Sequence, residues 1–411
     1  MVGAGRSKRR ERWEITHNYN KCDETLDRLS RRFGAMTASF KEREAEVLRS
    51  LFQKRGEIIN DRTHRIVLHP AATSKKKNEL VVFVHGLGHY NFVWMAFEQK
   101  FLDLGFSVCS YDLIGRGFSD YPSSGRFDLD EHVAQLHEDV IEPLVADHSF
   151  EGVHLVGTSQ GGAICVGYAS ICFDGLSKLR SMHLLAPAAF FGGKGSGTLG
   201  LSALKSLGCM SACLKPYLTS MGEQRKAWNA DFINKKCEAA KQCILALEAS
   251  HFNKEDHDRI SGAIWRVLMD FPFLDMKRHV YRCRELCKDG QLKVNLVWGM
   301  EDTICPFDNA AAWVDVFSGQ FDEDTIHDME DTSFQYTALM DAGHGLVVEF
   351  GDLTFVTILN ALRDWSFVEG KSTPTSASVN ISLENSNSSS IDAKATDDVV
   401  SNENISVYVD C

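Results

Sequence analysis

The sequence predicts an α/β fold with a mostly parallel, doubly wound sheet and an inserted helical cap. From residue 65 onward, short apolar runs alternate with helical patterns, which is typical of strand–helix–strand units in a parallel sheet. Glycines and polar residues directly follow several of these runs, where ligands bind in such sheets. Between residues 188 and 290 the alternation stops and only helical patterns occur, after a glycine-rich hinge at residues 192–197. This interruption predicts the cap.

The composition is that of a globular protein and excludes several classes of partner. A hydrophobic content of 44% can fill a sizeable core, and a formal net charge of −12 argues against nucleic acid. The 12 cysteines form no C-x-x-C pair and no zinc-like spacing, so we expect a reduced compartment. No apolar run reaches the roughly 18 residues of a membrane span, and the N-terminus lacks a secretory signal. We therefore expect a cytoplasmic protein without metal or cofactor.

Residues 1–60 precede the predicted core as an N-terminal extension. Five Arg and Lys residues between positions 6 and 12 are interpreted as a solvated tail, with a nuclear address or an anionic-lipid site as alternatives. Apolar residues with partial helical spacing at positions 35–52 predict an accessory helix on the outside of the main domain.

The predicted core comprises residues 61–187 and 291–370. Its strands are expected at residues 65–68, 80–84, 107–111, 153–156, 182–186, 292–298 and 334–340. Its helices are expected at residues 92–104, 130–145, 163–169, 308–317 and 353–365. Residues 371–411 are rich in Ser, Asn, Thr and Asp with few large apolar side chains, so this tail is predicted to be disordered.

Ser159 is the candidate nucleophile. It is the central residue of the G-x-S-x-G pattern at 157–161, between a predicted strand and a predicted helix. A serine at such a sharp turn takes strained backbone angles, so the residues two before and two after it must be small. Gly157 and Gly161 satisfy this requirement.

A serine hydroxyl needs a base, and the base needs an acid that orients it. His344 follows the last predicted strand in a glycine-flanked turn, and Asp302 follows the strand before it. Glu301 and Asp308 are the alternatives to Asp302, and His327 is the alternative to His344. The backbone N–H groups of Leu87 and Gln160 are the expected donors to an oxyanion.

Three further polar residues are predicted to be structural. We expect His85 to hold the oxyanion turn, Asp112 to anchor its loop and Arg116 to be a buried cation.

Cap residues predicted to bind substrate are Phe190, Phe191, Trp265, Phe271 and Phe273. Residues 199–218 are dense in apolar side chains, and we expect them to pack over the site. Peripheral contact with a membrane is the alternative.

The chain resembles the serine hydrolases of the α/β-hydrolase superfamily. The resemblance is carried by residues 85–88, 112–120, 157–162, 298–306 and 343–344. The resemblance is to the branch with a helical cap, which includes monoacylglycerol-lipase-like and esterase-like members. It implies an α/β-hydrolase fold and the order Ser, Asp, His along the chain. It also implies cleavage of a small-molecule or lipid ester through an acyl-enzyme. Members with an aspartate nucleophile are disfavoured because this chain has Ser159.

Two alternatives to ester hydrolysis stay open at this point. The same three side chains cleave amide or carbon–carbon bonds in related enzymes, because they do not select the leaving group. A non-catalytic, ligand-sensing member of the fold is the other alternative. The apolar cap favours an ester with an apolar acyl group, such as a monoacylglycerol.

Overall fold

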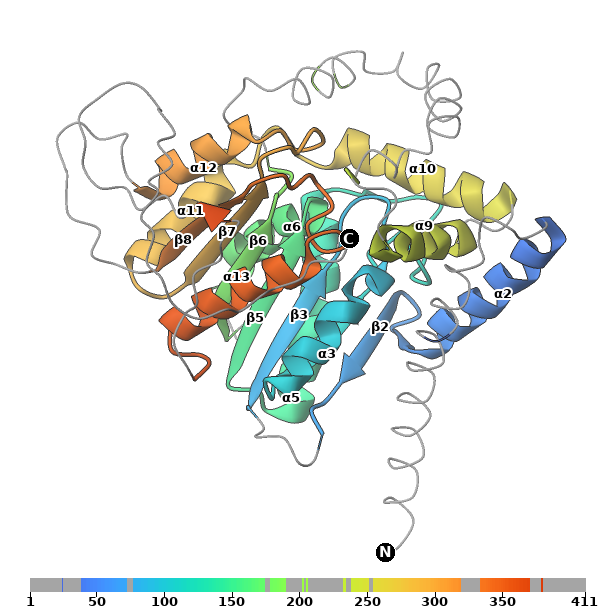
Figure 1. Cartoon of the computed structure of the whole chain (residues 1–411), viewed down its shortest axis with the longest axis horizontal. Coiled ribbons are helices and arrows are strands. Elements are labelled where there is room, and N and C mark those ends of the chain that lie inside the picture. The colour runs from blue at the N-terminus through green and yellow to red at the C-terminus, as the bar shows by residue number, and fades with distance from the viewer. Residues whose placement is uncertain are drawn as a thin grey trace, which may run out of the picture.

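The computed structural model describes most of the predicted core and part of the cap. It covers residues 38–71, 77–173, 178–189, 238–250, 254–318 and 333–369, with residues 24, 202, 205, 232, 233, 378 and 379. In this part of the chain, nine strands form one sheet in the order β1-β2-β4-β3-β5-β6-β7-β8-β9 (Figure 1). They are β1 (Glu57–Ile59), β2 (Thr63–Leu68), β3 (Glu79–Val84), β4 (Ser107–Tyr111), β5 (Gly152–Thr158), β6 (Leu179–Leu185), β7 (Lys293–Gly299), β8 (Phe334–Leu339) and β9 (Ser378–Val379).

The middle of the sheet is parallel and its edges are antiparallel. Strands β4, β3, β5, β6, β7 and β8 pair in parallel, whereas β1, β2 and β9 pair antiparallel to their neighbours. The central strands β3, β5 and β7 are buried along almost their whole length. Helices cover both faces of the sheet, so these strands consist of near-continuous runs of apolar residues, mainly Val and Leu. The predicted fold class is confirmed.

Two helical layers enclose the sheet (Figure 1). On one face, the 3-10 helix η2 (Asn91–Trp94) leads into α3 (Met95–Asp103), which contacts α13 (Gly351–Asp364). On the other face lie α4 (Leu129–Ala134), α6 (Gln160–Cys172), α11 (Lys277–Lys288) and α12 (Asp308–Ser318). Helix α4 continues through a π-helical turn, η3 (Gln135–Ile141), into α5 (Glu142–His148). Asp128 caps α4 by accepting a hydrogen bond from the N–H of Glu131 at 3.0 Å.

The described part of the cap consists of α9 (Glu238–Ser250) and α10 (Lys254–Asp270) (Figure 1). The predicted cap range, 188–290, also includes α11, but α11 packs against α6 in the layer that covers the sheet. Its Cys283 Sγ lies 3.6 Å from the carbonyl oxygen of Val166 in α6. Helical periodicity predicts an apolar face without identifying the surface that the face covers. Of the predicted membrane-contact segment 199–218, only Ser202 and Lys205 lie within the described residues.

The accessory helix expected near residues 35–52 is α2 (Ala38–Lys54), and it packs against α9. Its buried residues include Leu48, Leu51 and Phe52, and the Phe52 ring meets the Tyr90 ring edge-on at 5.8 Å. Just after α2, Arg55 forms a buried ion pair with Glu98 of α3 at 2.7 Å. This helix therefore contacts both the cap and the core.

The predicted disordered tail contributes one element to the described structure. Ser378 and Val379 form β9, which pairs with the end of β8. The other residues of the range 371–411 lie outside the described part of the chain. Among the described helices, none combines the length and the hydrophobicity that crossing a membrane requires.

Candidate active site

Ser159 lies in a strained turn between β5 and α6. Its backbone angles are φ 54° and ψ −120°, a region that residues with a side chain rarely occupy. Its N–H donates to the carbonyl oxygen of Leu185 at 2.9 Å. Its own carbonyl oxygen accepts from the N–H groups of Ala163 at 3.2 Å and Ala188 at 2.9 Å. These three hydrogen bonds hold the strained turn in place.

The two glycines of the motif are required by close backbone contacts. A Cβ atom at Gly161 would lie 2.1 Å from the carbonyl oxygen of Val84 in β3. A Cβ atom at Gly157 would lie 2.6 Å from the carbonyl oxygen of Gly161. Both distances are shorter than any real contact of this kind, so α6 starts this close to the sheet only with glycine at both positions.

Loops at the ends of β7 and β8 bring Asp302 and His344 together. Asp302 follows β7 and His344 follows β8, which are neighbouring parallel strands. The two loops touch, because the N–H of Glu301 donates to the carbonyl oxygen of Ala342 at 2.9 Å. Parallel strands end at the same edge of a sheet, which also carries Ser159.

The Asp302 carboxylate orients the His344 ring. Its Oδ2 lies 2.7 Å from His344 Nδ1, and its Oδ1 accepts from the N–H groups of Ile304 at 2.9 Å and Cys305 at 2.8 Å. The carboxylate is buried and has only acceptor atoms, so the proton of the hydrogen bond belongs to Nδ1. The ring then turns Nε2 away from Asp302. The alternatives Glu301 and Asp308 are exposed, and His327 lies outside the described residues.

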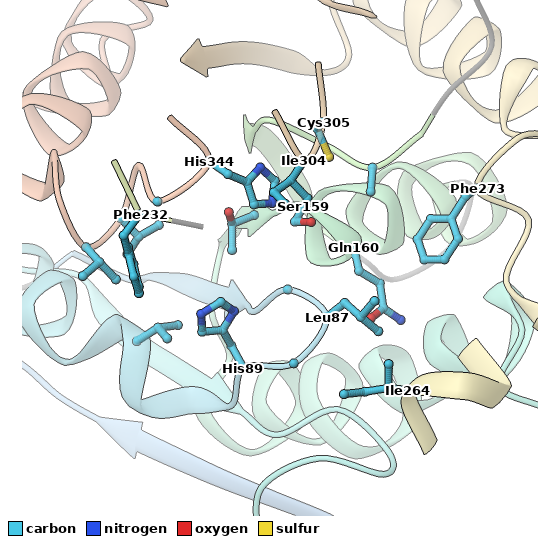
Figure 2. Close-up of a pocket in the computed structure, with 18 of the residues that line it drawn as sticks. Leu87, His89, Ser159, Gln160, Phe232, Ile264, Phe273, Ile304, Cys305 and His344 are labelled. Atoms are coloured by element: carbon cyan, nitrogen blue, oxygen red, sulfur yellow. The ribbon is translucent and has the colours of Figure 1, made fainter. Parts of the chain in front are cut away.

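Ser159 and His344 border the same cavity, of about 370 Å³, and Figure 2 shows the His344 ring beside Ser159. Most of the side chains around the cavity are apolar. The described residues that line it are Gly86, Leu87, Gly88, His89, Val93, Thr158, Ser159, Gln160, Ala188, Phe232, Ile264, Leu268, Phe273, Ile304, Cys305, His344, Gly345, Val347 and Val348.

The loop after β3, which carries the expected oxyanion donor Leu87, passes directly beside Ser159. A Cβ atom at Gly86 would lie 3.1 Å from the Cβ atom of Ser159. Leu87 follows Gly86 and lines the cavity with Gln160 (Figure 2). Within the described residues, no hydrogen bond uses the N–H of Leu87 or of Gln160. Both N–H groups are therefore open to an oxygen atom bound at Ser159.

His85 fixes this loop. Its Nδ1 lies 2.8 Å from the carbonyl oxygen of Gly86, and its Nε2 accepts from the N–H of Leu113 at 3.0 Å. Burial lowers the pKa of His85 to about 4, so the ring is neutral at neutral pH. A neutral ring with a proton on Nδ1 satisfies both hydrogen bonds, which matches the structural role expected for His85.

Asp112 anchors the next loop, as the sequence predicts. Its carboxylate accepts from the N–H groups of Asn91 at 2.7 Å and Phe118 at 3.0 Å. Gly117, at φ 51°, has no room for a Cβ atom, which would lie 2.4 Å from this carboxylate. Arg116 is 2% exposed, and burial lowers its pKa to about 10. Its guanidinium donates to the carbonyl oxygen of Gly115 at 2.7 Å.

The predicted substrate residues occupy different places. Phe273 lines the cavity, whereas Phe271 is fully buried against His132, with ring centroids 5.6 Å apart. Trp265 does not line the cavity in the described structure. Ile264 and Leu268, four residues apart in α10, present the helix face that does. Phe190 and Phe191 lie outside the described residues.

His89 and Phe232 are among the residues of the cavity wall that sequence reasoning missed. Burial and the nearby His344 lower the pKa of His89 to about 4, so a neutral imidazole faces the cavity (Figure 2). Its position in the turn that carries Leu87 was the available signal. Phe232 is 4% exposed, and the N–H of Ile233 donates to the Glu349 carboxylate at 3.0 Å. No sequence pattern marks Phe232.

In the described structure, no group of three His, Cys, Asp or Glu side chains is arranged to hold a metal ion.

Comparison with known proteins places this arrangement in a family. The model of the alpha/beta hydrolase family matches residues 81–353. The AB hydrolase superfamily protein YfhM of Bacillus subtilis (strain 168) is 27% identical over 125 residues, which is 30% of this chain and 42% of that protein. The match thus spans less than half the length of this curated relative.

Solved structures with the same fold carry several activities in their names. An esterase from Exiguobacterium antarcticum has 20% identity and a TM-score of 0.52, over 74% of this chain and 97% of that chain. MenH from S. aureus has 15% identity and a TM-score of 0.52, over 74% of this chain and 99% of that chain. A bromoperoxidase from Bacillus anthracis has 16% identity and a TM-score of 0.50, over 74% of this chain and 95% of that chain. At these identities the likeness concerns the fold alone.

Proposed function

The chain belongs to the alpha/beta hydrolase family, and from this premise we propose that it is a serine hydrolase that cleaves carboxylic esters. The observation that carries the proposal is the 2.7 Å hydrogen bond between Asp302 Oδ2 and His344 Nδ1, beside a cavity that Ser159 also borders. A nucleophile, a base and an orienting acid are thus available at one sheet edge.

In the proposed reaction, Ser159 Oγ attacks the ester carbonyl while His344 Nε2 takes the hydroxyl proton. The negative charge moves to the carbonyl oxygen, where the N–H groups of Leu87 and Gln160 stabilise it. Asp302 stabilises the imidazolium that forms. His344 then gives the proton to the departing alcohol, which leaves an acyl-enzyme on Ser159. Water attacks the acyl-enzyme with His344 as the base, and the released acid regenerates the hydroxyl.

The cavity supports an apolar acyl group. Cap and core contribute Val93, Phe232, Ile264, Leu268 and Phe273 to its wall. Burying a chain of methylene groups against such a wall contributes roughly 0.8 kcal/mol for each group. We therefore propose a monoacylglycerol or a similar lipid ester as the substrate class. Amides and substrates with a cleavable carbon–carbon bond belong in the same substrate panel, because the reacting residues are the same.

The experiment is a comparison of Ser159→Ala with Ser124→Ala, a matched change at an exposed serine. We expect Ser159→Ala to lose activity on p-nitrophenyl acyl esters by several orders of magnitude and to resist labelling by a fluorophosphonate. Ser124→Ala should behave as the wild type. Labelling that persists in a folded Ser159→Ala protein would overturn the assignment of the nucleophile.

Location and partners are proposals that rest on the sequence. We propose a cytoplasmic protein whose ligand is a small-molecule or lipid ester. We also propose, as a point to be tested, that residues 199–218 contact the membrane surface. Co-sedimentation with liposomes, in the wild type and in a charge-reversal variant of Lys205 and Lys215, tests that contact. Equal sedimentation of the two proteins would count against it.

A further inference from the structure

We propose that the side chain of Gln160 is a specificity determinant: its carbonyl oxygen accepts a hydrogen bond from the substrate. The preferred esters then carry a hydroxyl or amide N–H group within a few bonds of the scissile carbonyl. The inference rests on the proposed ester hydrolysis at Ser159. It deepens that proposal by assigning a polar feature to a substrate that binds in a mostly apolar cavity.

Gln160 Oε1 is a buried acceptor without a partner. The residue is 1% exposed, and within the described residues Oε1 accepts no hydrogen bond. Leaving a buried carbonyl oxygen without a donor is unfavourable, because the oxygen has lost its hydrogen bonds to water without replacing them. Gln160 lines the cavity, and Figure 2 shows its side chain beside Leu87 on the wall towards Ile264. A donor group of a bound substrate would satisfy Oε1.

His132 fixes the direction of the carboxamide. His132 Nδ1 lies 2.7 Å from the carbonyl oxygen of Asp128, and a carbonyl oxygen can only accept, so Nδ1 carries the proton. Burial lowers the pKa of His132 to about 4, which leaves a single proton on the ring at neutral pH. His132 Nε2 is therefore an acceptor.

The atom of Gln160 that faces this acceptor, at 3.3 Å, is the amide nitrogen Nε2. The flipped carboxamide would place two acceptors against each other and is disfavoured. The oxygen Oε1 is thus held on the other side of the carboxamide. His132 is in turn packed against Phe271 and Phe127, with ring centroids 5.6 and 6.4 Å away. It is a positioning residue for Gln160.

The place of Gln160 in the chain limits where the substrate donor lies. Its backbone N–H is one of the two proposed donors to the oxyanion, so its side chain starts next to the reacting carbonyl. The nearest labelled side chains on this wall, Leu87, Ile264 and Phe273, offer no competing polar group (Figure 2). A donor on the acyl chain or on the alcohol, close to the ester group, is the chemistry that fits.

The test uses matched esters that differ in one donor. On the acyl side these are the p-nitrophenyl esters of β-hydroxybutyrate, β-methoxybutyrate and butyrate. On the alcohol side they are the butyrate esters of ethylene glycol, of its monomethyl ether and of ethanol. We expect the wild type to prefer the hydroxyl ester of at least one series by about tenfold in kcat/KM, the size of a single neutral hydrogen bond.

The variant is Gln160→Met, which keeps the length of the side chain and removes both polar atoms. We expect it to lose the preference, so that the hydroxyl ester and the donor-free ester of a series are cleaved with kcat/KM values equal within about twofold. His132→Phe should weaken the preference by releasing the carboxamide. If Gln160→Met unfolds at a lower temperature, Gln160→Leu repeats the test. A preference of equal size in the wild type and in a folded Gln160→Met or Gln160→Leu protein overturns the inference.

Fluorophosphonate labelling separates the two proposals. A wild-type protein that is neither labelled at Ser159 nor active on any ester refutes the proposed function. A labelled, active enzyme that shows no donor preference in either series refutes the role of the Gln160 side chain and leaves the ester hydrolase in place.

Discussion

Replacement of Asp302 by asparagine tests the orientation of His344 without removing the side chain. One carboxylate oxygen, Oδ1, accepts from the N–H groups of Ile304 at 2.9 Å and Cys305 at 2.8 Å. In Asp302→Asn, the carbonyl oxygen of the new amide has to stay at that position, because an NH₂ group there would face two donors. The NH₂ group then faces His344 Nδ1, at the position where Oδ2 lies 2.7 Å away.

This swap reverses the tautomer of His344. An amide NH₂ only donates, so Nδ1 becomes an acceptor and the ring proton moves to Nε2. A protonated Nε2 cannot take the proton of Ser159. The equivalent change in serine proteases lowers turnover about 10⁴-fold, and we expect a loss of about 10³- to 10⁴-fold here, or about 4–5 kcal/mol in the activation free energy. The two backbone hydrogen bonds persist, so the melting temperature should stay within a few degrees.

The assay is kcat on p-nitrophenyl butyrate, with melting temperature measured on the same samples. Glu301→Gln and Asp308→Asn are the matched controls, because each removes one exposed carboxylate close in sequence to Asp302. We expect both controls to stay within about twofold of the wild type. Asp302→Asn that keeps more than a tenth of the activity with an unchanged melting temperature would refute the reasoning, and so would an equal loss in Glu301→Gln.

Three further predictions concern stability and are read from unfolding in urea. Gly161→Ala should lower the free energy of unfolding by about 3 kcal/mol, because its Cβ would lie 2.1 Å from a carbonyl oxygen of β3; a loss under about 1 kcal/mol would contradict this. Arg55→Met should cost about 3–5 kcal/mol by leaving the buried Glu98 carboxylate without its cation, and the added change Glu98→Leu should recover most of that loss. Burial lowers the pKa of His85 and of His132 from 6.5 to about 4, so the unfolded chain binds protons first on acidification. Stability should thus be full above pH 6.5 and fall between pH 6.5 and 4, by about 3 kcal/mol for each ring, and a flat profile over this range would contradict it.

Sequence patterns predicted the parts of the molecule that short-range chemistry determines. The G-x-S-x-G turn needs glycines at fixed positions, and the structure shows the backbone contacts that exclude a Cβ atom there. Asp302 and His344 were identified as residues at strand ends, and parallel pairing of β7 with β8 brings them together. The positions of strands β2 to β8 along the chain follow from the same regularity, because each apolar run is long enough for one buried strand.

Contacts between distant segments were beyond the sequence patterns. An aromatic residue in the cap was an attractive candidate for substrate contact, yet Trp265 is turned away because Ile264 and Leu268 share the face towards the cavity. Helical spacing cannot distinguish these faces when apolar residues occur on both. Phe232 lines the cavity, and the N–H of its neighbour Ile233 donates to the Glu349 carboxylate at 3.0 Å. Such a pairing over more than a hundred residues leaves no local trace.

The contact between α2 and α9 changes which part of the chain should be treated as one unit. The family match begins at residue 81, after α2, β1, β2 and the Arg55 side chain that reaches α3. A protein trimmed to the matched segment would bare the surface of α9 that α2 covers. Expression and crystallisation work on this protein should therefore retain everything from residue 38 onward. Shorter versions would lack the helix that packs against the cap, and measurements on them would describe a protein with an altered cap.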